Sequence, residues 1–172
     1  MAQISNLDKK YDPAIEPIRA LYDEYFGGGM NSIVFQEMRE TRGLAYSAWA
    51  SIMPPSYLKY PYVLRTQIAT QNDKMIDAVT TFNDIINNMP ESEAAFKLAK
   101  DGLTNRLRTE RIIKGDIIWS YINAQDLGQN VDPRIKLYND IQNMSLKDIV
   151  DFQKQWVKGR TYVYCILGEK ND

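Results

Sequence analysis

Residues 25–46, Tyr25-Phe-Gly-Gly-Gly-Met-Asn-Ser-Ile-Val-Phe-Gln-Glu-Met-Arg-Glu-Thr-Arg-Gly-Leu-Ala-Tyr46, determine how this chain folds. Before the glycines, apolar residues spaced three and four apart between Ile18 and Phe26 predict an amphipathic helix. Glycine adopts backbone conformations that other residues avoid. Gly27, Gly28 and Gly29 therefore predict the end of this helix and a tight turn.

A second, shorter helix is predicted directly after the turn. Asn31 or Ser32 can cap it by accepting a hydrogen bond from an unpaired backbone N–H, and Gly43 marks its end. Residues 44–52 and 62–70 then predict two strands, because side chains alternate along a strand with a period of two. The prolines between them predict a loop, so the two strands form a long antiparallel hairpin.

Three consecutive glycines also raise the possibility of a phosphate-binding loop. A P-loop places Lys and Ser or Thr after its last glycine, whereas Met30 and Asn31 follow here. A dinucleotide-binding loop follows a strand, whereas these glycines follow a helix. The local chemistry therefore favours a helix end and a turn.

The rest of the chain predicts one short strand at residues 2–7, a mostly helical second half and a last strand at residues 161–167. The predicted helices of the second half cover residues 73–89, 92–112, 117–127, 132–141 and 145–157. Strands that are separated by a helical block and include a hairpin indicate an α+β fold. We expect one mainly antiparallel sheet with a layer of helices on one face.

Length and composition are those of one globular domain spanning residues 1–172, which we expect to be a piece of a longer protein. Hydrophobic residues make up 44% of the chain and charged residues 25%, both ordinary values. The net charge of −1 and the lack of a basic stretch argue against nucleic-acid binding. No apolar run approaches the roughly 18 residues that predict a membrane span. The sequence assigns no compartment, and Cys165, in an apolar run, is predicted to be buried.

The sequence contains no histidine. This absence excludes histidine general bases, Ser-His-Asp and Cys-His catalytic sites, and zinc sites with histidine ligands. A single cysteine also excludes a cysteine-rich zinc site, and the acidic residues lack the spacing of a calcium-binding EF-hand loop. A carboxylate site for magnesium or calcium stays open. We expect this chain to hold neither a metal ion nor a cofactor.

Residues 25–47 resemble the pitrilysin/insulinase family of zinc metallopeptidases, which includes the mitochondrial processing peptidases. The shared pattern is a helix that ends in Gly-Gly, a small and apolar segment, and then Arg39-Glu-Thr-Arg-Gly-Leu-Ala-Tyr46. The hairpin, the long helices and the terminal strand also resemble one half-domain of that family.

The resemblance implies a role beside a separate catalytic half. Members of this family consist of two similar halves that close around a peptide, and the N-terminal half carries the zinc motif His-x-x-Glu-His. A chain without histidine resembles the non-catalytic, C-terminal half. By resemblance, Tyr46 would donate a hydrogen bond to the scissile carbonyl or the oxyanion, and Arg39 would hold the peptide backbone. The partners implied are a zinc-bearing half and a peptide substrate, with a weaker expectation that Gly27, Gly28 and Gly29 contact the peptide.

Other readings of the same residues stay open at this point. Arg39 could complement a helix end, Tyr46 could serve packing alone, and Arg42 competes with Arg39 for the functional role. The fold could also serve a structural or assembly subunit, or a protein-interaction domain without peptidase activity.

Overall fold

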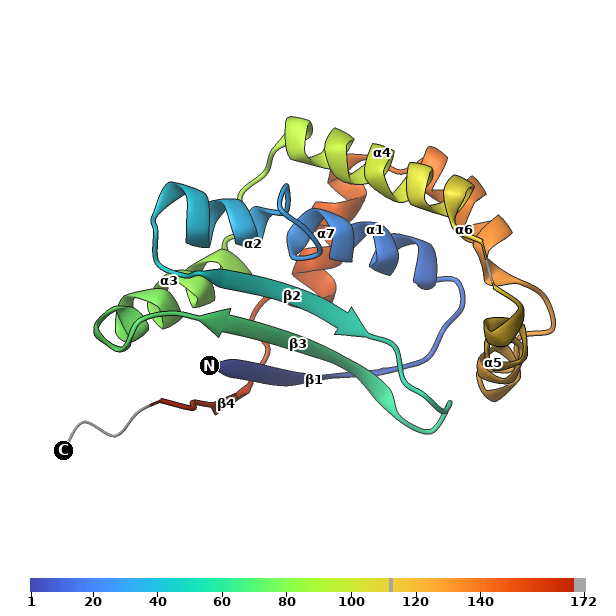
Figure 1. Cartoon of the computed structure of the whole chain (residues 1–172), viewed down its shortest axis with the longest axis horizontal. Coiled ribbons are helices and arrows are strands. Elements are labelled where there is room, and N and C mark those ends of the chain that lie inside the picture. The colour runs from blue at the N-terminus through green and yellow to red at the C-terminus, as the bar shows by residue number, and fades with distance from the viewer. Residues whose placement is uncertain (112, 169–172) are drawn as a thin grey trace.

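The computed structural model of the chain describes residues 1–111 and 113–168. Within these ranges, four strands form one antiparallel sheet in the order β2-β3-β1-β4 (Figure 1). The strands are β1 (Ala2–Lys10), β2 (Ser47–Met53), β3 (Pro61–Ala69) and β4 (Val163–Cys165). The hairpin of β2 and β3 is confirmed, and β1 lies between β3 and β4.

Helices cover one face of this sheet (Figure 1). The first half of the chain contributes α1 (Glu16–Phe26), α2 (Ile33–Phe35) and the π-helical turn η1 (Gln36–Thr41). The second half contributes the 3₁₀ turn η2 (Asn72–Lys74), α3 (Met75–Asn87), α4 (Glu93–Thr109), α5 (Lys114–Asp126), α6 (Pro133–Gln142) and α7 (Leu146–Trp156). This arrangement confirms the predicted α+β fold with one antiparallel sheet.

The core forms between the inner face of the sheet and α1. Alternate residues of the strands point inward, among them Leu7 of β1 and Leu64 of β3, both at most 2% exposed. Helix α1 buries Tyr22 completely, and the Tyr22 ring lies 5.1 Å from the ring of Phe152 on α7. Phe152 in turn stacks on Trp156 at 5.0 Å. An aromatic cluster therefore joins α1 and α7 on the inner face of the sheet.

Several predicted boundaries shift for local reasons. The strand predicted from residue 44 begins at Ser47, because the N–H groups of Leu44 and Ala45 both donate to the carbonyl of Met38, at 2.8 and 3.2 Å. The predicted helix 92–112 ends at Thr109, and residue 112 lies outside the described residues.

The prediction that Cys165 is buried is wrong. Cys165 is exposed, because β4 is a three-residue strand at the edge of the sheet. Cys165 lies opposite Ala2 of β1, on the face of the sheet that carries no helix.

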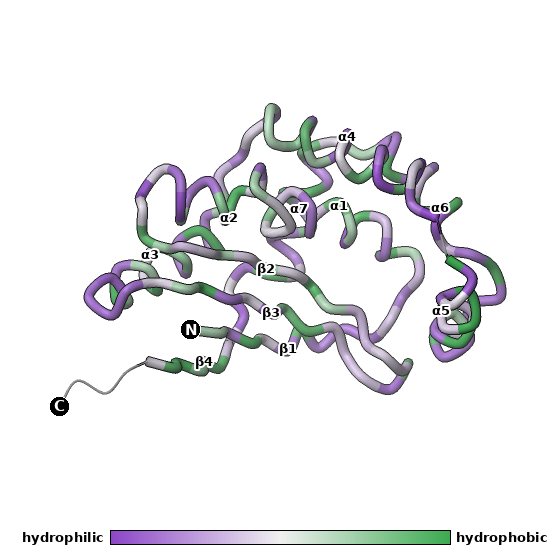
Figure 2. Tube along the Cα trace, viewed as in Figure 1, coloured by the Kyte–Doolittle hydropathy of each residue, from purple (hydrophilic) through white to green (hydrophobic). Residues whose placement is uncertain are grey.

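Helix α5 was predicted from its apolar residues, yet it buries none of its side chains. Figure 2 shows apolar residues (green) along α5 as well as along the strands. Ile117, Ile118, Trp119 and Tyr121 are each more than half exposed. These side chains leave an apolar surface on α5.

Candidate functional site

The end of α1 is shaped by the close approach of its backbone to β2. Gly27 is buried, and a Cβ atom at this position would lie 2.3 Å from the carbonyl oxygen of Ala50. At Gly28, a Cβ atom would lie 2.8 Å from the carbonyl oxygen of Asp23. Gly29 is exposed, and its nearest neighbour, a Glu24 carboxylate oxygen, would lie 4.0 Å away. Gly27 and Gly28 thus have a packing reason to be glycine, whereas Gly29 has none.

Ser32, and not Asn31, caps the second helix, which begins at Ile33. The Ser32 hydroxyl oxygen accepts a hydrogen bond from the Phe35 N–H at 3.4 Å and donates its own hydrogen to the Gly29 carbonyl at 2.6 Å. The helix then widens into η1, which Gly43 terminates with a left-handed φ of 58°. The predicted order of helix, turn, helix and strand is therefore confirmed.

Tyr46 is held at the start of β2 by two contacts. Its N–H donates to the Ala69 carbonyl at 2.8 Å, and its hydroxyl oxygen accepts a hydrogen bond from the Gln71 side-chain amide, also at 2.8 Å. The Tyr46 side chain is 65% exposed. Because Gln71 donates, the hydrogen of the Tyr46 hydroxyl stays free to donate to another group.

The loop that carries Tyr46 is fastened to the residues after β3. The Thr70 hydroxyl donates to the Leu44 carbonyl at 2.5 Å, and the Lys74 ammonium donates to the Gly43 carbonyl at 3.1 Å. These residues surround a small pocket of about 80 Å³ beside Tyr46. Thr70, Gln71 and Lys74 belong to no motif in the sequence, and their place at the far end of the predicted hairpin is the one signal for them.

Arg39 lies on η1 with its guanidinium 5.0 Å from the centre of the Phe35 ring. An ion pair joins it to Glu40 at 3.6 Å, and about half of its side chain is exposed (51%). Arg42, the competing arginine, pairs with Glu37 at 3.1 Å. Over the described ranges, no hydrogen bond joins Arg39 to Tyr46, and Arg39 does not line the pocket beside Tyr46.

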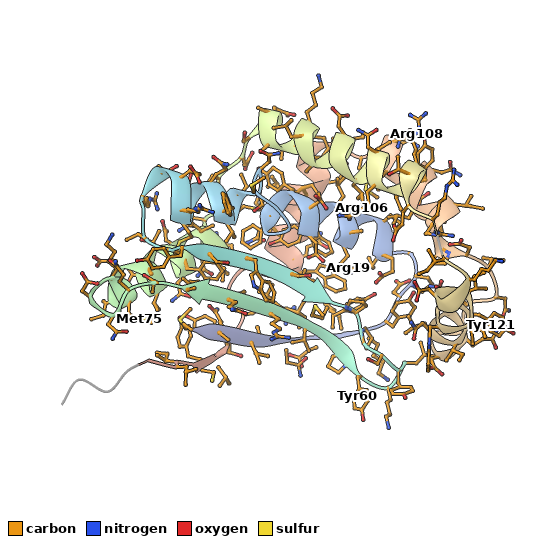
Figure 3. All side chains as sticks on the ribbon, in the orientation of Figure 1. Arg19, Tyr60, Met75, Arg106, Arg108 and Tyr121 are labelled. Carbon is orange, nitrogen blue, oxygen red and sulfur yellow. The ribbon has the colours of Figure 1, made fainter. Side chains whose placement is uncertain are left out.

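A partly buried ionic cluster fixes the outer edge of β2 against α1. The Asp23 carboxylate accepts hydrogen bonds from the Ile52 N–H (2.8 Å), the Ser51 hydroxyl (2.9 Å) and the Arg19 guanidinium (2.8 Å). Arg19 also binds Glu16 and the Ile52 carbonyl. Figure 3 shows Arg19 projecting from α1 toward the strands.

Burial raises the pKa of Asp23 to about 6, although Arg19, Ile52 and Ser51 oppose the rise. Two carboxylates, those of Asp23 and Glu16, share the single guanidinium of Arg19, so the cluster carries a net negative charge when both are ionised. This cluster stabilises the corner and has no exposed reactive group.

A larger pocket, of about 640 Å³, lies elsewhere. It is bounded by the residues that precede and begin α1, by α5 and by α6, and Tyr11, Leu127 and Leu137 contribute to its mostly apolar wall. Neither Arg39 nor Tyr46 lines it, and neither do the three glycines. The pocket is thus separate from the predicted site.

Residues 1–111 and 113–168 contain no group of three histidine, cysteine, aspartate or glutamate side chains that could hold a metal ion. None of the helices within these ranges is long and apolar enough to cross a membrane.

Comparison with solved structures supports the fold. The inactive peptidase domain of a candidate zinc protease from Bordetella parapertussis matches with a TM-score of 0.73 at 12% identity, over 96% of this chain and 90% of that one. The peptidase M16 inactive domain from Pseudomonas fluorescens matches with a TM-score of 0.66 at 16% identity, over 89% of this chain. A protease from Helicobacter pylori matches with a TM-score of 0.67 at 11% identity, over 90% of this chain. The match spans 37% of the length of the Pseudomonas chain and 37% of the Helicobacter chain.

No curated protein sequence matches the chain. A family model described as the peptidase M16 inactive domain matches residues 17–103, which is more than half of the 172 residues and includes the whole glycine and Arg39–Tyr46 corner. The chain therefore belongs to the family of peptidase M16 inactive domains, the non-catalytic C-terminal halves of the pitrilysin/insulinase peptidases.

Proposed function

We propose that residues 1–172 form the substrate-binding half-domain of a zinc endopeptidase. This half-domain closes over a peptide that is held by a separate, zinc-bearing half. The observation that carries the proposal is the state of the Tyr46 hydroxyl. The exposed Tyr46 side chain accepts a hydrogen bond from Gln71, so its own hydroxyl hydrogen stays free to donate. The backbone hydrogen bond of Tyr46 to Ala69 fixes its position.

The chemistry of Tyr46 suits peptide hydrolysis. Negative charge develops on the scissile carbonyl oxygen when water attacks, and a fixed donor stabilises that charge in the transition state. Zinc in the companion half would activate the attacking water. The Tyr46 hydroxyl supplies a hydrogen-bond donor, and the hydrogen bond from Gln71 holds it in place before the peptide arrives.

Arg39 contributes in a different way. Its ion pair with Glu40 is long and half exposed, so a peptide carbonyl or carboxylate can replace Glu40 at small cost. Because Arg39 is held less firmly than Tyr46, its contact with the peptide forms on binding. We therefore expect Arg39 to act mainly on KM and Tyr46 mainly on kcat.

The test is a kinetic comparison in the two-half parent protein with zinc content measured for every variant. Tyr46→Phe should lower kcat by about 10²-fold with zinc retained, as loss of an oxyanion donor does. Tyr60→Phe is the matched control, because Tyr60 is also about half exposed but lies in the β2–β3 loop (Figure 3). An unchanged kcat for Tyr46→Phe would contradict the proposal.

A second pair of variants separates the two arginines. Arg39→Ala should raise KM several-fold, whereas Arg42→Ala, which removes a similar ion pair from the neighbouring turn, should not. Equal effects of the two substitutions on KM would indicate that Arg39 has a structural role only. The chain alone is expected to show neither zinc binding nor peptidase activity.

A structural or assembly role is the second candidate. The exposed apolar surface of α5, formed by Ile117, Ile118, Trp119 and Tyr121, favours it. Under this role, substitutions at Tyr46 leave activity of the assembly unchanged, while charged substitutions on α5 reduce its assembly.

A further inference from the structure

One face of the sheet carries no helix anywhere in the described part of the chain (Figure 1). The strand register shows which residues occupy it, since residues opposite one another share a face. They are Ala2, Ile4, Asn6 and Lys10 of β1, Ser47, Trp49, Ser51 and Met53 of β2, Pro61, Val63, Arg65, Gln67 and Ala69 of β3, and Val163 and Cys165 of β4. We call this set the open face. Its charged residues are Arg65 and Lys10, and Lys10 lies at the end of the sheet, opposite Pro61.

Arg65 lies near the centre of the open face. It stands opposite Ser51 on one side and Ile4 on the other, and Ile4 stands opposite Val163. Arg65 is exposed, and its guanidinium lies 5.7 Å from the centre of the half-buried Trp49 ring. Stacking on an aromatic face orients the planar guanidinium and leaves its N–H groups available.

Within the described ranges, no carboxylate lies within ion-pair distance of Arg65. Other arginines do form ion pairs, as Arg19 does with Glu16, Arg106 with Glu24 and Arg160 with Asp8. An oriented guanidinium without an anionic partner, surrounded by uncharged side chains, is suited to bind a carboxylate through two parallel hydrogen bonds.

The outer edge of β2 has few free backbone groups with which a peptide strand could pair. The Ile52 N–H is bound by Asp23, the Ile52 carbonyl by Arg19, and the Ala50 N–H faces the Gly27 carbonyl at 3.5 Å. A peptide strand therefore cannot pair with this part of the edge without displacing α1. The open face stays accessible alongside it.

We propose that Arg65 and Trp49 form a subsite that binds an acidic side chain of the extended peptide substrate. This inference rests on the function proposed above. Trp49 follows Tyr46 by three positions (49 − 46), and Arg65 stands opposite Ser51, five positions after Tyr46 (51 − 46). At about 3.3 Å per residue, these positions lie roughly 10–16 Å from Tyr46 along β2. An extended peptide has the same rise, so the acidic residue lies about three to five residues from the scissile bond.

The experiment uses the zinc-loaded parent protein and pairs of peptides that differ only by Glu or Gln at one position, two to six residues from the cleaved bond. At one of these positions the parent should cleave the Glu peptide with a kcat/KM about fivefold higher, the scale of a partly exposed ion pair. Arg65→Gln should abolish this preference by lowering the kcat/KM for the Glu peptide to that for the Gln peptide. Arg108→Gln, an exposed arginine on α4 (Figure 3), is the control and should keep the preference.

The outcomes separate this inference from the proposed function. If Tyr46→Phe lowers kcat but no position favours Glu, or if Arg65→Gln keeps the preference, the acidic subsite is wrong and the proposed function stands. If Tyr46→Phe leaves kcat unchanged, the proposed function itself fails. The preference should also weaken as salt is added, because exposed ion pairs are screened; a preference that is independent of salt would overturn the ionic basis of the subsite.

Discussion

Replacement of Gly27 by alanine should destabilise the fold strongly. The added Cβ atom would lie 2.3, 2.4 and 2.8 Å from the oxygen, nitrogen and carbonyl carbon of Ala50. All three are backbone atoms of β2, so no side chain can rotate to make room. Helix α1 and β2 must therefore move apart, which also lengthens the contact between the Ala50 N–H and the Gly27 carbonyl.

The magnitude follows from this geometry. Extra atoms in a packed core cost about 1–3 kcal/mol, and a collision with backbone belongs at the upper end of that range. We expect Gly27→Ala to lower the free energy of unfolding by about 3 kcal/mol. For a domain of this size, that loss lowers the melting temperature by roughly 6–12 °C.

Gly29 provides the matched control, two positions along the same turn. It has open space around it and no left-handed φ, so Gly29→Ala should change stability by less than about 1 kcal/mol. Urea unfolding followed by tryptophan fluorescence and by circular dichroism measures both variants. Equal stability of the two variants would refute the assignment of Gly27 to a close backbone contact.

Two further predictions concern buried polar groups. Thr66 is completely buried and its hydroxyl has no hydrogen-bond partner, so Thr66→Val should stabilise the fold by about 1 kcal/mol in urea unfolding; a loss of stability would show that the hydroxyl is bonded. Because burial raises the pKa of Asp23 from 3.8 to about 6, the folded chain binds this proton more tightly than the unfolded chain. Its contribution to stability is therefore complete below about pH 4 and falls by about 3 kcal/mol by about pH 7. Asp23→Asn should remove this dependence of the free energy of unfolding on pH. Urea unfolding of both proteins across this pH range measures it, and the same pH dependence in both would contradict the shifted pKa of Asp23.

The local parts of the fold could be predicted because their signals are local. Ser32 caps its helix as predicted. The helices predicted from residues 92 and 145 are capped by Ser92 and by a capping box of Ser145 and Asp148, since a cap depends only on residues three positions away. The glycine turn and the β2–β3 hairpin are equally short-range. The order of the elements, and with it the α+β class, followed from these signals.

The surroundings of the candidate site depend on contacts between distant residues and were not predictable in the same way. Gln71 reaches Tyr46 across 25 positions because β2 and β3 pair with the register that places Ser47 opposite Ala69. Periodicity predicted both strands but could not supply their register to one residue. The wrong prediction for Cys165 has a related cause. Its apolar neighbours indicate a strand, but they do not tell whether that strand is central and buried or lies at the edge of the sheet.

Gly27 and Tyr46 act as one unit, although only Tyr46 presents a reactive group. The contact of Gly27 with Ala50 sets the distance of β2 from α1, and Asp23 holds the same strand at Ile52. Tyr46 is the residue that leads into β2, and its N–H and hydroxyl are fixed on β3 and just beyond it. A shift of β2 away from α1 therefore displaces Tyr46 together with the strand. Under the proposed function, Gly27 supports catalysis by positioning Tyr46, and contact of the exposed Gly28 and Gly29 with the peptide stays a prediction.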